Sequence, residues 1–435
     1  MNKKDSYYWK RLDNVAAFYA SVTTTHNPYV YRLSVKLKEK IVLDKLTKAL
    51  DDTLLAIPSF MVKLRKGFFW YYLEENNKKT IIMEDDHFAT RPINNIQNNY
   101  FLFKVTYFEK RINVDFSHIL TDGIGALDFL KTLVINYLKQ KHPKKISKTI
   151  ISETEMVSLN EMSDDSFLKY FKMANDEGKE SVRKDNIKAF KLKNKKKKDL
   201  IDVIVGTMSV DELKAITKTK NVTITAYLTA LLIYSIYHGN YKYADSKAPI
   251  SIAVPVNLRN FFPSSSMNNF FSTIIISLDV MKKDYSFDDV LEIVSLKMKE
   301  ELDESSLLNN FRSFVKLHSN LILRFIPIFI KDIVLRNINR WVSKKGSTSS
   351  LSNLGIIHMP DEVKQYVDKF DMISYTDIST SMKIGICSFN DTLSVSFSSG
   401  LNDTEVERIF FTSLTNNGIK VNISSSLTVS RRQSK

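Results

Sequence analysis

The sequence contains almost no cysteine: Cys387 is the only one among 435 residues. A single cysteine excludes disulfide bonds within the chain and cysteine-based metal sites. We therefore predict no metal centre, and a reducing compartment, the cytoplasm, as the location. Cys387 lies in the strand-like run 384–389, where we expect a small buried side chain and not a nucleophile.

The sequence also lacks a long uninterrupted run of apolar residues. Residues 1–8 contain no hydrophobic segment, so we expect no signal peptide. The most apolar stretch, 321–335, is interrupted by Arg324, Lys331 and Asp332 and is too short to cross a bilayer. We predict that it forms a helix of a protein core. An apolar tunnel lining and peripheral contact with a membrane surface are the alternatives.

Acidic residues are outnumbered, 48 against 63 lysines and arginines, which gives a formal net charge of +15. The basic residues are spread along the chain except for the dense run 191–198, which is typical of a solvated linker. No zinc-finger spacing and no aromatic RNA-binding motif accompany this charge, so we predict no nucleic-acid partner. No G-x-G-x-x-G motif opens a helix, which argues against a dinucleotide-binding fold.

The length and the hydrophobic content of 43% indicate two units or two similar halves. Residues 1–145 and 201–435 each combine antiparallel strand patterns with amphipathic helices, whereas 146–200 is polar and weakly patterned. We predict an α/β (α+β) fold in which two halves, each a mixed sheet flanked by helices, are joined by a crossover linker. Thr225 is the expected N-cap of a helix in the second half.

One short motif, His-Ile-Leu-Thr-Asp-Gly at 118–123, combines a histidine with a turn. Apolar residues alternate with polar ones along the preceding strand pattern 111–117, and His118 continues the apolar phase. Gly123 permits a tight turn, and a helical pattern starts at Ile124. A histidine at such a strand end can act as a general base because its pKa lies near neutral pH. A hydrogen-bonded core histidine is the alternative.

Two further motifs follow in order, Pro-Val-Asn-Leu-Arg at 255–259 and Leu-Ser-Asn-Leu-Gly at 351–355. Together with 118–123 they resemble the chloramphenicol-acetyltransferase-like superfamily of acyltransferases, which includes peptide-synthetase condensation domains. The segments 9–16 and 67–72 look most like the alcohol acetyltransferase branch, with the wax ester synthases close to it. Ser117 stands where condensation domains usually carry a first histidine, and the D-F-G-W-G motif of the plant enzymes is absent.

The resemblance implies two halves with a channel between them and a reaction at His118. His118 would take a proton from an alcohol or amine that attacks an acyl-CoA thioester, with no permanently bound cofactor. Asp122 and Gly123 would shape the catalytic turn, and Arg259 would be the structural partner of Asp122. Ser352 and Asn353 would form the oxyanion or substrate loop.

Three functional hypotheses stay open at this point. The first is a CoA-dependent acyltransferase that transfers an acyl group, such as acetyl, to an alcohol. The second is a condensing enzyme that takes a phosphopantetheine thioester from a carrier protein and forms an ester or amide. The third is a non-catalytic binding protein that kept the fold, and the intact motif at 118–123 argues against it.

Overall fold

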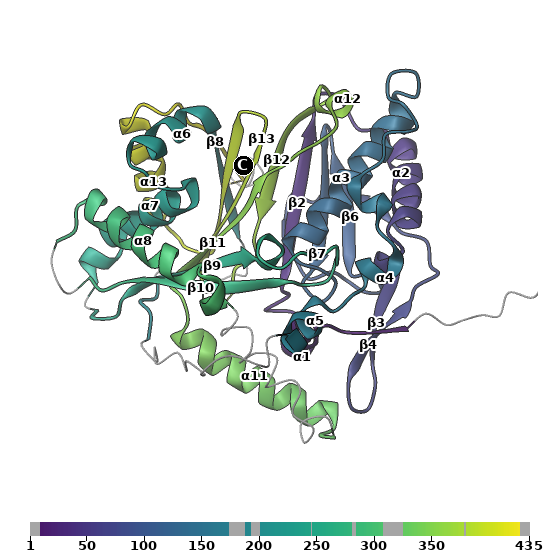
Figure 1. Cartoon of the computed structure of the whole chain (residues 1–435), viewed down its shortest axis with the longest axis horizontal. Coiled ribbons are helices and arrows are strands. Elements are labelled where there is room, and N and C mark those ends of the chain that lie inside the picture. The colour runs from purple at the N-terminus through teal and green to yellow at the C-terminus, as the bar shows by residue number, and fades with distance from the viewer. Residues whose placement is uncertain are drawn as a thin grey trace, which may run out of the picture.

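The computed structural model describes residues 9–173, 188–192, 201–244, 246–280, 284–307, 325–377 and 380–426. Two halves lie side by side, each with one large sheet (Figure 1). Helices α2 and α3 cover the outer face of the N-terminal sheet, and α6, α7, α8 and α13 cover that of the C-terminal sheet. The predicted two-halved α/β fold is confirmed.

The sheets are most easily followed by their strand order. The N-terminal sheet has the order β12 (Val367–Ile373), β2 (Val30–Leu37), β7 (Arg111–Ser117), β6 (Phe103–Phe108) and β5 (Ile82–Glu84). The C-terminal sheet has the order β10 (Phe271–Leu278), β9 (Ile250–Asn257), β11 (Ser349–Ile356), β13 (Met382–Phe389), β14 (Thr392–Ser399), β8 (Asp202–Ser209) and β15 (Asn422–Ser425). A small third sheet has the order β1 (Trp9–Arg11), β4 (Tyr71–Glu75) and β3 (Val62–Lys66).

The α-helices of the described residues are distributed along the chain among these strands. They are α1 (Asn14–Val22), α2 (Leu43–Ala56), α3 (Gly123–Lys141), α4 (Leu159–Met162), α5 (Ser166–Met173), α6 (Val210–Thr219), α7 (Ile224–Gly239), α8 (Phe287–Glu301), α11 (Ile328–Lys345), α12 (Asp361–Lys364) and α13 (Glu405–Asn416). Within these ranges no single helix is long and apolar enough to span a membrane; α6 and α7 reach that length only as a pair bent by 85°.

Strand β12 crosses from the C-terminal part of the chain into the N-terminal sheet, where it pairs antiparallel with β2. The two halves are therefore tied together by backbone hydrogen bonds as well as by the chain segment 146–200. Gly385 of β13 allows a close approach of β12, because a Cβ atom there would overlap with the carbonyl oxygen of Met372. The domain boundaries at 145 and 200 stay a prediction.

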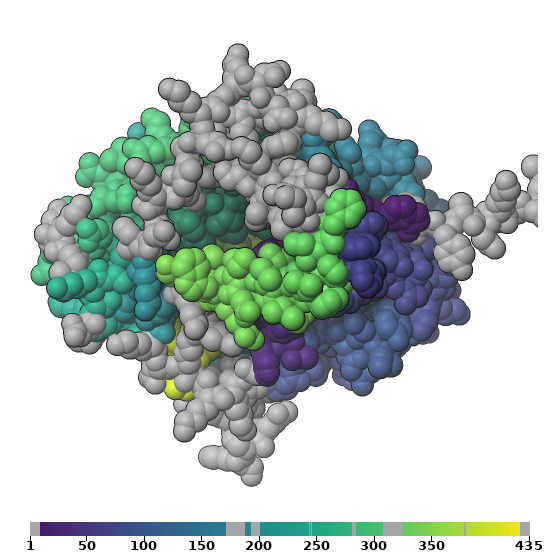
Figure 2. Space-filling view, turned by 90° about the horizontal axis from the view of Figure 1, so that it is seen from below, coloured from purple at the N-terminus to yellow at the C-terminus, as the bar shows by residue number. Residues whose placement is uncertain are grey.

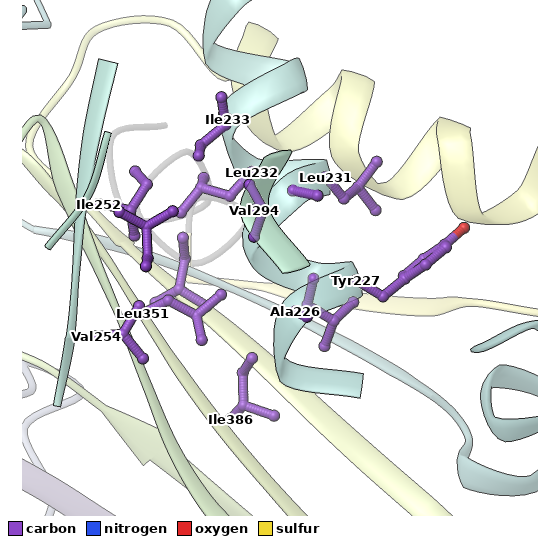
Figure 3. Packing of buried hydrophobic residues seen from close by; sticks show 14 of the residues in the cluster. Ala226, Tyr227, Leu231, Leu232, Ile233, Ile252, Val254, Val294, Leu351 and Ile386 are labelled. Atoms are coloured by element: carbon purple, nitrogen blue, oxygen red, sulfur yellow. The ribbon is translucent and has the colours of Figure 1, made fainter. Parts of the chain in front are cut away.

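The two large sheets bury separate hydrophobic cores. In the C-terminal half, Leu232 of α7 points toward Ile252 of β9, whereas Leu231 points to the opposite side of the helix; both belong to one cluster with Val254 of β9 and Leu351 of β11 (Figure 3). The middle part of α7 is buried all round, as expected for a helix that is apolar on every side. This packing fixes β9 and β11, the strands that carry two of the three sequence motifs.

Two expectations differ from the structure, and part of a third lies outside the described residues. Thr223, and not Thr225, caps α7, because its hydroxyl oxygen accepts the N–H of Ala226. The described part of the apolar stretch 321–335 is no core helix: α11 lies on the surface, with Phe329 among its exposed side chains. Residues 193–198 of the lysine-rich run and residues 321–324 lie outside the described residues.

Candidate active site

A cavity of about 300 Å³ lies between the two halves. The N-terminal half contributes Tyr19, Tyr31 and His118 together with the turn that follows His118. The C-terminal half contributes residues of β9, β10, β11 and β13. All three sequence motifs contribute residues to the lining of this cavity.

His118 directly follows β7, and both halves fix its backbone. Its N–H donates to the carbonyl of Tyr29 at 3.0 Å, and its carbonyl accepts the side-chain amide of Asn269 at 3.0 Å. The imidazole stacks on Tyr19, with ring centres 4.9 Å apart, and lies 4.5 Å from the ring of Tyr31. The ring is thus held between two aromatic side chains at the cavity wall.

The surroundings of His118 keep its imidazole neutral. Burial is the largest cause and lowers the pKa of His118 to about 4, the carboxylate of Asp122 raises it, and the ammonium of Lys383 lowers it. Nδ1 of the ring is buried and has no hydrogen-bond partner within the described part of the chain. At pH 7 the ring is in the form that can accept a proton.

Asp122 borders the cavity, but both of its carboxylate oxygens are engaged in structure. Oδ1 accepts the N–H groups of Ile124 and Gly125, both at 3.1 Å, and so caps α3. Oδ2 accepts Nη1 of Arg259 at 2.7 Å and the N–H of Phe270 at 2.8 Å. Because both oxygens already accept hydrogen bonds from the protein, the Asp122 carboxylate orders the turn and is not positioned to exchange protons with a substrate.

Arg259 fastens the loop between β9 and β10 to this turn. Besides its contact with Asp122, Nη2 donates to the carbonyls of Ser266 and Asn268, both at 2.8 Å. The structure therefore brings together the two residues that the family resemblance paired across 137 positions. The guanidinium suits this task because its planar fork offers several donors at once.

The N-terminal segment adds a second connection that the sequence motifs did not assign. Asp13 caps α1 through the N–H of Ala16 at 2.7 Å, and its other oxygen accepts the side-chain amide of Asn269 at 3.2 Å. Burial, the largest cause, raises the pKa of Asp13 to about 6. The same amide of Asn269 binds the His118 carbonyl, so the segment 9–16, quoted above only for its resemblance, supports the candidate base.

The loop residues Ser352 and Asn353 both line the cavity, but their side chains differ in the hydrogen bonds that they already make within the protein. The amide nitrogen of Asn353 donates to the hydroxyl of Thr225 at 3.0 Å, and its oxygen accepts the N–H of Gly355 at 2.8 Å. No hydrogen bond within the described residues holds the hydroxyl of Ser352. Of the two, Ser352 is the better placed to donate to an oxyanion.

Two glycines of the turn differ in what a side chain would meet. At Gly123 a Cβ atom would lie 2.8 Å from the end of the flexible Leu354 side chain. At Gly125 it would overlap with the hydroxyl of Thr121 and lie 2.7 Å from the carbonyl of Met267. Gly123 is the glycine of the motif, yet Gly125 is the one that the packing requires.

Sequence reasoning missed a charged group at the wall of the cavity. Nζ of Lys383 lies 3.0 Å from the carboxylate of Asp377 and 3.8 Å from the centre of the Tyr375 ring. Lys383 stands in β13 between two buried apolar residues, and this was the one sequence signal that could have marked it. Lys383 lines the same cavity as His118, with its ammonium paired to Asp377.

The cavity between two sheet-and-helix halves, with a histidine turn fixed by both, can be compared with solved structures. The structure is similar to trichothecene 15-O-acetyltransferase TRI3 from Fusarium sporotrichioides, with 11% identity over 96% of each chain and a TM-score of 0.63. It is also similar to F. graminearum TRI101 in complex with coenzyme A and T-2 mycotoxin, with 10% identity over 92% of this chain and 96% of that one and a TM-score of 0.59.

A third similar structure is the first condensation domain of the CDA synthetase, with 12% identity over 93% of this chain and 94% of that one and a TM-score of 0.56. At sequence identities of 10–12%, the similarity to these three structures shows that the fold is shared. No curated protein sequence matches the chain significantly. The chain belongs to the alcohol acetyltransferase family, whose family model matches residues 108–404, and the resemblance stated from the sequence is confirmed.

Proposed function

We propose that the protein transfers an acyl group from a CoA thioester to the hydroxyl group of an alcohol, with His118 as general base. The observation that carries this proposal is the neutral imidazole of His118 on the wall of a cavity formed by both halves. Membership of the alcohol acetyltransferase family supports the reaction class. The fold shared with TRI101, which was solved in complex with coenzyme A, supports the donor.

The reaction follows from the state of the imidazole. His118 takes the proton of the acceptor hydroxyl while the hydroxyl oxygen forms a bond to the thioester carbonyl carbon. The tetrahedral intermediate then collapses, the C–S bond breaks, and the leaving thiolate takes the proton from the imidazolium. Because burial disfavours the charged ring, the imidazolium is a costly species in this site, and its proton is passed on readily to the thiolate.

The oxyanion of the intermediate needs a hydrogen-bond donor, and Ser352 is our candidate. Its hydroxyl lines the cavity and is not occupied by the described residues, whereas the Asn353 amide is occupied by Thr225. Asn353 then positions the loop, and one such oxyanion donor typically contributes roughly 10²–10³-fold in rate. Lys383, paired with Asp377, sits on the same cavity wall.

The test is acyl transfer by the purified chain with a panel of acyl-CoA thioesters and alcohols, followed by release of free thiol. We expect His118→Ala to lower turnover by roughly 10²–10⁴-fold, the usual contribution of a positioned base. His358→Ala, at an exposed histidine, is the matched control and should leave turnover unchanged. Wild-type turnover in a folded His118→Ala variant would remove His118 from the mechanism.

A further inference from the structure

Helix α11 is oriented with its polar side toward the protein. Asn339 donates its amide to the hydroxyl of Tyr29 at 2.8 Å, and Arg336 donates Nε to the carbonyl of Ser21 at 2.9 Å. Asp332, the one acidic residue of the helix, is buried on this side. A surface helix of a globular protein normally buries its apolar side instead.

The opposite side of α11 is apolar and faces away from the protein. Six of its side chains have exposed fractions between 48 and 59%: Phe329, Ile333, Val334, Ile338, Trp341 and Val342. Figure 2 shows the helix, in light green, lying across this face from the C-terminal to the N-terminal half. A continuous apolar stripe of this kind marks an interaction site, because scattered single residues would not align on one helix side.

The tip of the β3–β4 hairpin extends this stripe. The N–H of Ile328 donates to the carbonyl of Phe68 at 2.8 Å, and Nζ of Lys331 donates to that of Phe69 at 2.8 Å. Phe68 and Trp70, at the same tip, are 66 and 58% exposed. The hairpin tip and α11 are thus joined by hydrogen bonds, and both expose aromatic side chains.

The described charges on the outward side of α11 are basic. The one acid of the helix, Asp332, is turned inward to accept the hydroxyl of Tyr71 at 2.8 Å, while Lys331 and Arg336 donate to backbone carbonyls of the protein. Arg340 is exposed between the apolar side chains, and Nζ of Lys345 lies 3.9 Å from the ring centre of Trp341. Aromatic and apolar side chains interspersed with cations match the interface of an anionic bilayer, where rings sit at the headgroup level and cations meet lipid phosphates.

We propose that the outward side of α11 and the β3–β4 hairpin tip form a docking surface for an anionic lipid bilayer. The docking rests on none of the catalytic assignments. The proposed docking surface is also connected to the cavity. Tyr29, which binds Asn339 of α11, packs against Tyr19 and Tyr375, and both of these tyrosines line the cavity. A docked protein would hold its cavity close to the membrane surface, where apolar substrates concentrate.

The experiment is flotation of the full chain with vesicles of phosphatidylcholine and phosphatidylglycerol in equal amounts, and with vesicles of phosphatidylcholine alone. We expect flotation with the anionic vesicles, weaker flotation with the neutral ones, and loss as salt rises. The double variant Ile333→Gln/Trp341→Gln should bind roughly tenfold less, because two interfacial anchors are removed. Its matched control is Leu55→Gln/Leu296→Gln, two exposed apolar residues on α2 and α8, which should bind like the wild type.

Tryptophan fluorescence provides a second readout, because all three tryptophans, Trp9, Trp70 and Trp341, are exposed in the free protein. We expect a blue shift of the wild-type emission with anionic vesicles. Wild-type protein that stays in the soluble fraction, or a double variant that floats as well as its control, would overturn the proposal. So would a wild type that dimerises in light scattering without binding vesicles while the double variant is monomeric, since a second copy would then cover the face.

Discussion

The contact between Arg259 and Asp122 should act as one energetic unit across the two halves. We consider Arg259→Met, which keeps the apolar stem, and Asp122→Asn, which keeps the shape of the side chain. The side chains of the pair are 11 and 5% exposed, and their atoms approach to 2.7 Å. Neither charge can gain much from water when its partner is removed, so each single variant leaves an uncompensated group.

The magnitude follows from the contacts that each variant loses. Breaking one side of a buried pair costs about 3–5 kcal/mol. Arg259→Met lies at the upper end, because the carbonyls of Ser266 and Asn268 also lose their donor, at about 1 kcal/mol each. Asp122→Asn lies at the lower end, because the amide oxygen can still cap α3. The double variant removes both charges at once, and we expect a coupling of about 1–3 kcal/mol.

Urea unfolding of the four proteins, followed by circular dichroism, gives the coupling in the free energy of unfolding. Hydrogen exchange of residues 266–270 gives the local counterpart, since the N–H of Phe270 is bonded to Asp122. Strictly additive losses, within about 0.5 kcal/mol, would show that the two residues do not act together. Unchanged exchange in 266–270 would show that the pair does not hold the loop.

Two further predictions concern the same site. Gly125→Ala should destabilise the fold by about 1–3 kcal/mol, because the added methyl group overlaps with the Thr121 hydroxyl. Gly123→Ala should destabilise it less, because the methyl group there meets only the flexible Leu354 side chain. Thermal unfolding of the two variants measures the difference. Lys383→Met removes a cation that lowers the pKa of His118, so this pKa rises. The acidic limb of the pH profile of kcat/KM should then move to higher pH, and an unmoved limb in an active variant would contradict either His118 as the titrating base or its coupling to Lys383.

The part of the site that is local in sequence could be predicted. Strand β7, the turn and α3 follow one another, and the alternation of Ile112, Val114 and Phe116 gives the direction of His118 without any knowledge of the rest. The pairing of Asp122 with Arg259 came from a resemblance, since no local pattern connects positions so far apart. Asn269 and Lys383 carry no motif, and only the folded chain brings them to His118.

Helix α11 shows a different limit of sequence patterns. Its amphipathic sequence pattern predicts one apolar and one polar side, and from hydrophobicity alone the apolar side is expected to face the protein core. In the structure the polar side has fixed partners in the body of the protein, through Asn339, Arg336 and Asp332. Those partners lie in segments more than 200 residues earlier in the chain, so the sequence could not show which side was satisfied.

The segments that hold His118 come from separate parts of the chain, and this arrangement couples the base to the junction of the halves. Asp13, from the N-terminus, and the His118 carbonyl share the amide of Asn269 in the β9–β10 loop. Arg259 binds the same loop to Asp122, four residues after His118. A movement of the C-terminal half that opened the cavity would pull on Asn269 and Arg259 together. The backbone of His118 and the turn that follows it therefore depend on the same loop of the C-terminal half.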